Sequence, residues 1–220
     1  MGRNSHILRI KKEHSIYYSY FKRFHRNYTI YRPHEKTMSQ TSDSDGLLIP
    51  ISKHDNIQGT IDAQTILVKY GDYQCLSCGE VHRMIQEIQQ QIQLCFVFRH
   101  FPRIHIHFQA QKAAEAAEAA AAQNKFWQMH NLLFENQYAL NNGHLLEYAN
   151  EIQLDINRFL QDITGHVHVE RVAQNIQGGI QSGVSNTPAL FINGVRYRDA
   201  WDTERLLAAI LDQRLRQHAS

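Results

Sequence analysis

The residues in this sequence best suited to chemistry are two cysteines, Cys75 and Cys78. They follow an apolar, β-branched run at 65–70, which predicts a buried strand. They open a segment, about 76–91, whose apolar residues recur at helical spacing. A cysteine in the first turn of a helix meets unpaired backbone N–H groups and the positive end of the helix dipole, and both lower its pKa. We expect Cys75 to be the exposed nucleophile and Cys78, one turn later, to be the more buried resolving thiol.

Other interpretations of the cysteines stay open at this point. A Cys-x-x-Cys pair is half of a tetrahedral zinc site, and His100, His105 or His107 could complete it, although structural zinc sites use tighter ligand blocks. A further alternative is that both cysteines are core side chains without a chemical role. Cys95 alternates with apolar residues in a second predicted strand, 95–99, and is expected to be a small buried side chain without a redox role.

A second motif lies about 110 residues after the cysteine pair, where Thr187 and Pro188 precede an apolar strand. A proline at the start of a buried strand cannot donate to the ladder, and a cis Thr187–Pro188 bond would explain its presence. Asn193-Gly194 then predicts a two-residue hairpin turn. A final helix is expected to begin after Asp202 and to end near Arg214.

The remaining elements follow from composition and periodicity. Residues 47–52 alternate weakly and suggest a short edge strand, and 59–64 suggest a turn. Most of 106–183 has helical patterns, including an alanine-rich stretch at 109–122. The order is therefore strand, helix, strand, a large helical insertion, then two strands and a helix.

Several blocks, in order, resemble the DsbA-like branch of the thioredoxin superfamily. The chain is most similar to a group of small thioredoxin domains, some of which are fused to sodium/proton antiporters. The resemblance covers about 48–211. The matching blocks are VKYGDYQC at 68–75, FRHFP at 98–102, AAEAA at 113–117, KFWQMH at 125–130 and TPALFING at 187–194.

The resemblance implies a thioredoxin-like α/β fold over 46–215, with the helical insertion at about 106–183. It implies that Cys75 and Cys78 form the redox-active disulfide. It also implies that the loop of Thr187 and Pro188 packs against them and, with Leu76 and Ser77, contacts the substrate. That substrate would be a protein or peptide disulfide or dithiol. No cofactor and no metal are implied, and the redox partner is not identified.

Two departures from the family pattern affect the chemistry. Leu76 and Ser77 stand where relatives usually have proline and an aromatic residue or histidine, and this dipeptide tunes the redox potential. Lys69, six residues before Cys75, occupies a position that is often acidic in relatives, where a carboxylate can accept the proton of the resolving thiol. A charged lysine cannot do so. A buried, neutral lysine could, but we expect Lys69 to be exposed to solvent. Asp72 or Glu80 could substitute for the missing acid.

The charge of the chain is uneven. Residues 1–37 hold nine Lys/Arg and two Asp/Glu, whereas 38–220 hold fourteen and nineteen. The basic segment could be a nucleic-acid or lipid-binding arm, a transit peptide or a disordered tail. Alternatively, translation begins at Met38 and the preceding residues come from a misplaced start. We favour the last two, assign 1–45 to a basic N-terminal extension, and expect no nucleic-acid partner.

Composition bounds the remaining classes. The chain is 43% apolar and 20% charged and is long enough to bury a core without disulfides. Three cysteines exclude a disulfide-braced small secreted domain, and no apolar run is long enough to span a bilayer. Without a recognisable signal peptide, we expect a cytoplasmic location, which is reducing.

We therefore predict a thiol–disulfide oxidoreductase that works as a reductase or isomerase rather than as an oxidant. The alternative is a zinc- or peptide-binding module that uses the same scaffold without turnover. A glutathione-linked enzyme is a third option, and the paired cysteines argue against it because such enzymes usually keep one nucleophile.

Overall fold

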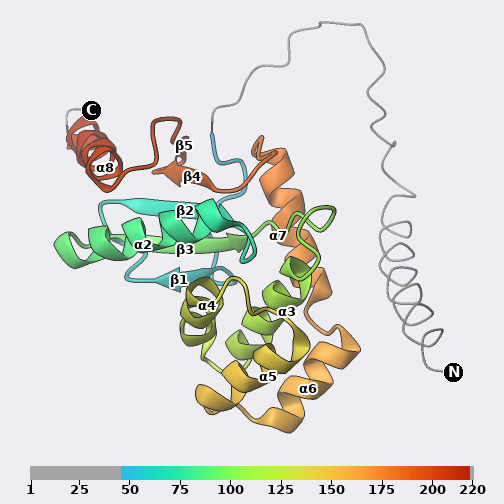
Figure 1. Ribbon diagram of the computed structural model, residues 1–220. Coiled ribbons are helices and arrows are strands. Elements are labelled where there is room, and N and C mark those ends of the chain that lie inside the picture. The colour runs from blue at the N-terminus through green and yellow to red at the C-terminus, as the bar shows by residue number, and fades with distance from the viewer. Residues whose placement is uncertain (1–45, 219–220) are drawn as a thin grey trace, which may run out of the picture. The chain divides into compact units, whose positions relative to one another are not determined.

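A computed structural model describes residues 46–218 of the chain. In this part the chain forms one five-stranded sheet and seven helices (Figure 1). The basic segment predicted at 1–45 lies outside the described residues. The elements are β1 Asn56–Gln58, β2 Ile66–Gly71, α2 Leu76–Gln91, β3 Cys95–His100, α3 Ala110–Ala121, α4 Phe126–Glu135, α5 Asn142–Glu151, α6 Ile156–Gly165, α7 Val169–Gln181, β4 Ala189–Ile192, β5 Val195–Arg196 and α8 Thr203–His218.

The sheet has the strand order β1-β3-β2-β4-β5, and only β2 and β3 are parallel. Parallel neighbours need a crossover connection, and α2 supplies it. The strand, helix, strand, helical insertion, hairpin and final helix occur in the predicted order. The thioredoxin-like fold class is confirmed.

Both faces of the sheet are covered, and side chains along β2 alternate between them. Leu67 belongs to the core on the side of α2, together with Phe96 and Phe98 of β3. Val68 and Tyr70 belong to a second core on the opposite side, where residues of α7 and of the segment before β1 pack. The central strands β2 and β3 are therefore buried, apart from the half-buried Ile66 at the start of β2.

The insertion between β3 and β4 consists of α3 to α7. Helix α3 is buried almost all round because its small alanine side chains allow neighbouring helices to approach closely; all of its core alanines are at most 1% exposed. Side chains cap two of the following helices: Asn141 accepts N–H groups at the start of α5, and Asp155 accepts one at the start of α6.

A local pattern predicted the hairpin correctly but did not predict the edge strand. Asn193 and Gly194 both have positive φ, 48° and 83°, as the predicted tight turn requires. The edge strand predicted at 47–52 is wrong: only Gly46 makes an isolated bridge, to Val195. The opposite edge is instead β1, whose three residues pair antiparallel with β3. Helix α8 continues four residues beyond Arg214.

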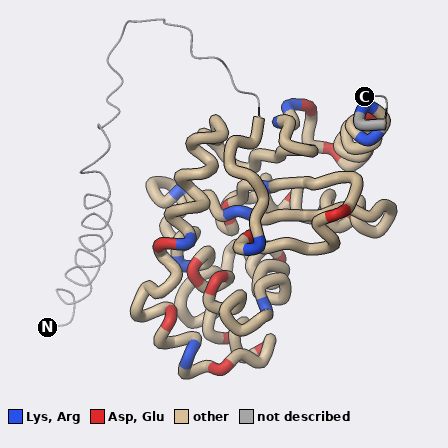
Figure 2. The backbone as a smooth tube through the Cα atoms, turned by 180° about the vertical axis from the view of Figure 1, so that it is seen from behind, with Lys and Arg blue, Asp and Glu red and all other residues tan. Residues whose placement is uncertain are grey.

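Charged residues of both signs are interspersed along the described chain (Figure 2). None of the helices within residues 46–218 has the length and apolar character needed to cross a membrane.

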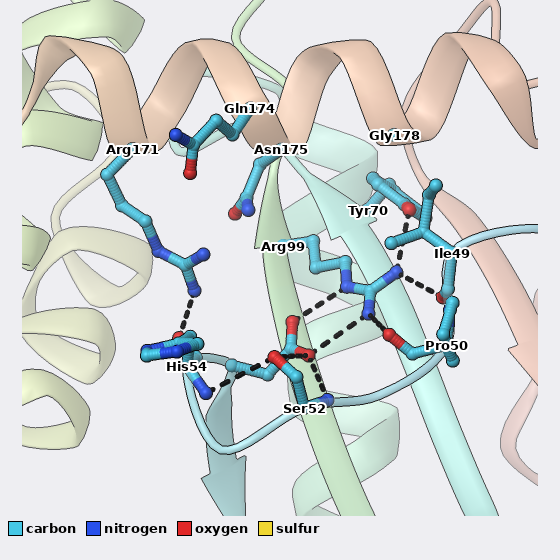
Figure 3. A pocket seen from close by; sticks show the side chains of 11 residues that line it. Ile49, Pro50, Ser52, His54, Tyr70, Arg99, Arg171, Gln174, Asn175 and Gly178 are labelled. Atoms are coloured by element: carbon cyan, nitrogen blue, oxygen red, sulfur yellow. Dashed lines mark hydrogen bonds and ion pairs between the residues drawn. The ribbon is translucent and has the colours of Figure 1, made fainter.

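One buried cation fixes the segment that precedes β1. Arg99 of β3 donates to both carboxylate oxygens of Asp55, at 2.8 and 3.1 Å, and to the carbonyls of Ile49 and Pro50 (Figure 3). The side chains of Arg99 and Asp55 are 3% and 5% exposed. These groups line a pocket of about 250 Å³ beside α7. The guanidinium is fully hydrogen-bonded to protein oxygens. Its presence in this pocket is therefore explained by its structural role, which is to hold the segment before β1.

Replacing Arg99 should therefore be costly. Arg99→Met keeps most of the side-chain volume but leaves the Asp55 carboxylate buried and unpaired, so we expect a loss of about 3 kcal/mol or more in the free energy of unfolding. Urea denaturation measures this loss. Arg205→Met is the control, since the ion pair of Arg205 with Asp199 is 61% exposed on both sides and should contribute less than about 1 kcal/mol. Equal losses in the two variants would contradict the structural role.

Candidate active site

Helix α2 begins directly after Cys75, as predicted from the sequence. Cys75 is the N-cap residue, with extended backbone angles, and its carbonyl accepts the N–H groups of Cys78 and Gly79. No side chain caps this helix, and its first turn holds no acidic residue. The first turn brings the two cysteines close together, and both are free thiols.

The accessibilities of the two cysteines have the expected order, but both are low. Cys75 is 8% exposed and Cys78 is fully buried. Cys75 is therefore less exposed than we predicted, because the loop before β4 covers it: its thiol lies 3.5 Å from the carbonyl oxygen of Thr187. The Thr187–Pro188 peptide bond is cis. Leu76, 51% exposed, and the exposed Ser77 lie on the solvent side of the pair.

The electrostatics of Cys75 favour its thiolate. The pKa of Cys75 is lowered from 9.0 to about 6, chiefly by a hydrogen bond from the Cys78 side chain and also by the Cys78 N–H. Burial and the Asp72 carboxylate raise it, but by less in total. At neutral pH Cys75 is therefore mostly a thiolate nucleophile. In Cys78, burial and the hydrogen bond to Cys75 raise the pKa well above its ordinary value.

Lys69 lies beneath the cysteine pair and not at the surface. The prediction of solvent exposure is wrong: Lys69 is 0% exposed, and its Nζ donates to the carbonyl oxygen of Cys78 at 2.8 Å. The physical reason is that α2 covers the face of β2 to which Lys69 points. Burial lowers the pKa of Lys69 from 10.5 to about 8, and attraction to Cys78 and Cys75 opposes that shift.

Neither proposed substitute for the missing acid occupies its place. Glu80 is exposed to solvent on α2. Asp72 is buried, but its carboxylate is already engaged: Oδ1 accepts the N–H of Gln74, and Oδ2 accepts the N–H of Arg103 and lies 2.7 Å from Nδ1 of His107. Asp72 therefore holds the loop after β3 against the active-site turn.

Two of the histidines considered as zinc ligands, His100 and His107, have other partners. His100 lies 2.8 Å from Glu118, and His107 contacts Asp72. Within residues 46–218, His, Cys, Asp and Glu side chains form no group of three or more that could hold a metal ion. Cys95 is fully buried in the second core, on the opposite side of the sheet from α2.

Sequence reasoning missed the support that α4 and the loop after it give to the site. Gln137 donates from Nε2 to the carbonyl oxygens of Cys75 and Tyr73, at 2.7 and 2.9 Å. The Tyr73 hydroxyl lies 2.8 Å from Nδ1 of His130. Tyr73 and Tyr70 are both buried. Only the long-range packing of the insertion reveals these contacts, and no local pattern indicates them.

Comparison with known proteins agrees with this geometry. Residues 52–212 match the sequence model of the thioredoxin family. The chain belongs to the thioredoxin family. Among solved structures, α-DsbA1 of Wolbachia pipientis has a TM-score of 0.66 at 20% identity and covers 79% of this chain and 96% of its own. Oxidised BdbD of Bacillus subtilis gives 0.66 at 20% identity, covering 73% and 93%. The DsbA-like resemblance inferred from the sequence is confirmed.

Several sequence relatives are longer proteins, which this chain matches in part. A Na⁺/H⁺ antiporter, NhaA 1, of Salinispora arenicola is 37% identical over 166 residues, which is 74% of this chain and 26% of the antiporter. The NhaA antiporter of Herminiimonas arsenicoxydans is 36% identical over 160 residues, 72% and 25%. The chain therefore spans about a quarter of the length of these relatives.

The lowered pKa of Cys75 gives a testable pH dependence. The thiolate is the reactive form, so the rate of alkylation of Cys75 by iodoacetamide should rise about tenfold per pH unit below pH 6 and level off above it. Mass spectrometry of reduced protein quenched at each pH measures the rate. Cys75→Ser is the control and should show no fast-reacting thiol near neutral pH. A midpoint near pH 9 in the unaltered chain would contradict the site's electrostatics.

Proposed function

We propose that this chain is a thiol–disulfide oxidoreductase in which Cys75 is the nucleophile and Cys78 the resolving thiol. The observation that carries the proposal is the placement of the two thiols in one helical turn. Cys75 stands at the N-terminus of α2 with a lowered pKa, and Cys78 lies fully buried behind it. The fold supports the same reaction class, because DsbA-like proteins share it.

The reaction consists of two exchanges. The Cys75 thiolate attacks one sulfur of a substrate disulfide, the substrate S–S bond breaks, and the leaving sulfur takes a proton. Cys78 then loses its proton, and its sulfur attacks Cys75. The bond between Cys75 and the substrate breaks, and the substrate sulfur leaves with the electron pair and takes a proton. The substrate is reduced to two thiols and the enzyme is oxidised to a Cys75–Cys78 disulfide. The reverse sequence donates a disulfide.

For the direction, we propose isomerisation rather than net reduction or oxidation. An isomerase needs a thiolate nucleophile that persists while the enzyme is reduced, and a pKa of about 6 at Cys75 supplies it. The same stabilisation of the reduced form makes the site a weaker reductant than a site whose thiol is less acidic. The expected partner remains a protein or peptide that carries disulfides or thiols.

For substrate docking, we propose the surface around Cys75. Leu76 is half-exposed beside the nucleophile and offers an apolar contact for a poorly folded polypeptide. Ser77 is exposed next to it, and the Thr187–Pro188 loop lies on the other side of the sulfur. These four residues are the docking residues predicted from the sequence. The cytoplasmic location also stays a prediction, which cell fractionation tests.

Single substitutions should separate the roles of the two cysteines. Cys75→Ser removes the nucleophile and should reduce the rate of insulin disulfide reduction to that of the reductant alone. Cys78→Ser leaves attack intact but blocks resolution, so mixed disulfides with substrate should accumulate on Cys75 and be visible by mass spectrometry. Cys95→Ser is the matched control and should retain turnover. Turnover at the unaltered rate in Cys75→Ser would refute the assignment.

The redox potential tests the direction. In a glutathione titration with alkylation and mass counting, we expect one two-electron step confined to Cys75 and Cys78, near the value of about −180 mV that is typical of an isomerase. A potential near about −270 mV would instead assign the chain to the reductases, and one near about −120 mV to the oxidants.

A further inference from the structure

Lys69 is a buried cation placed against the redox pair. Its position in β2 follows that of Leu67 by two residues, so both side chains face α2. Its Nζ bonds the Cys78 carbonyl oxygen at 2.8 Å and lies 4.3 Å from the centre of the Phe134 ring and 5.8 Å from that of Phe98. The amine is therefore enclosed by α2, α4 and β3, with one carbonyl and two aromatic faces as its contacts.

No carboxylate among the described residues lies within ion-pair distance of this amine. The nearby carboxylate in the active-site turn, Asp72, is engaged by backbone N–H groups and by His107. A charge at Lys69 thus has no permanent counter-ion in this part of the chain, which is unusual because buried charges in proteins are almost always paired.

The titratable groups that face Lys69 are two thiols and two histidines. Cys75 is the N-cap of α2, Cys78 and His82 belong to α2, and His130 belongs to α4. Burial lowers the pKa of His82 to about 3 and that of His130 well below its ordinary value, and the charge of Lys69 lowers both further. The histidines are therefore neutral at physiological pH. The two thiols are the groups that can supply a negative charge.

We propose that Lys69 is the internal counter-ion of the reduced active site and that it positions and stabilises the Cys78 thiolate during resolution of the mixed disulfide. This inference rests on the proposed oxidoreductase function. Lys69 does not touch the substrate, so it is a positioning residue and not a catalytic one.

In the reaction, the positioning role belongs to the second exchange. In the mixed disulfide, Cys75 is bonded to the substrate sulfur and carries no charge. Cys78 must then become a thiolate in a fully buried position, where an uncompensated anion is unfavourable. The Lys69 ammonium balances that anion. The Cys78 sulfur attacks Cys75, the bond from Cys75 to the substrate breaks, and the substrate sulfur leaves with the electron pair. In net terms, the proton lost by Cys78 ends on the substrate sulfur.

The same charge biases the redox equilibrium. The disulfide form offers Lys69 no anion, whereas the reduced form does. Lys69 therefore favours the dithiol over the disulfide, which moves the potential in the oxidising direction. A carboxylate at this position would have the opposite electrostatic effect, since it repels a thiolate and acts instead by accepting a proton.

The test uses two substitutions that separate charge from hydrogen bonding. Lys69→Met removes the charge and the donor while remaining apolar in the core. Lys69→Gln also removes the charge but keeps an N–H donor for the Cys78 carbonyl. Both are made in a full-length Cys75→Ala/Cys95→Ala background, in which Cys78 is the one remaining thiol of the sequence. Thiolate ultraviolet absorbance, corrected for tyrosine with a cysteine-free chain, gives the Cys78 titration. Circular dichroism verifies folding.

We expect the titration midpoint of Cys78 to rise by at least about one pH unit, tenfold in acidity, in both Lys69→Met and Lys69→Gln. Unchanged midpoints would overturn the proposal. A rise in Lys69→Met that Lys69→Gln reverses would overturn it too, because the hydrogen bond and not the charge would then be responsible.

A second measurement uses the chain with all its cysteines. Lys69→Met should raise the equilibrium constant for oxidation by glutathione disulfide about tenfold, which is about 30 mV toward reducing potentials. No shift, or a shift toward oxidising potentials, would overturn the inference. Neither measurement needs substrate turnover. If the chain does not reduce insulin but the titration of Cys78 still depends on Lys69, the proposed function is refuted and the inference about Lys69 is not.

Discussion

The parallel pairing of β2 with β3 is the constraint on which the active site depends. Parallel neighbours cannot be joined by a tight turn, so the chain must cross over the sheet, and it does so through α2. The N-terminus of α2 then stands at the carboxyl end of β2, where Cys75 caps it. The same geometry places α2 over one face of β2 and buries whatever side chain points there. Lys69 points there. One topological requirement therefore determines the positions of both the nucleophile and the cation beneath it.

Burial and the neighbouring charges shift the pKa values at the site in opposite directions. The larger effect decides which groups are charged. The lowering of the Lys69 pKa from 10.5 to about 8 means that burial, net of attraction to the thiols, costs its charged form about 3 kcal/mol. Because the lowered value still lies above neutral pH, the amine stays mostly protonated there. Cys75 is mostly ionised under the same conditions. A lysine ammonium and a thiolate thus coexist in a site from which water is largely excluded.

The sequence predicted the elements that have strong local signals. The limits of α2 and the positions of the strands at 66–71 and 95–100 follow from periodicity, and the hairpin follows from Asn193-Gly194. Strand β1 was missed because Asn56 and Gln58 are polar, and it exists through its pairing with β3. The contacts of Gln137 with Cys75 and of His130 with Tyr73 were missed because packing of the insertion, which has no local signature, brings these residues to the site. Lys69 was misplaced because its residue type favours exposure, whereas its place in a strand covered on both faces determines burial.

Two buried cations in adjacent strands show how structure and chemistry use charge differently. Arg99 in β3 has a carboxylate, Asp55, and two backbone carbonyls, so its charge is balanced in every state of the protein. Lys69 in β2 has one carbonyl and two aromatic rings, and its charge is balanced when a thiol ionises. A permanently paired cation contributes equally to oxidised and reduced protein and cannot shift the equilibrium between them. A cation without a fixed counter-ion favours whichever state supplies an anion, and in this site that state is the reduced one.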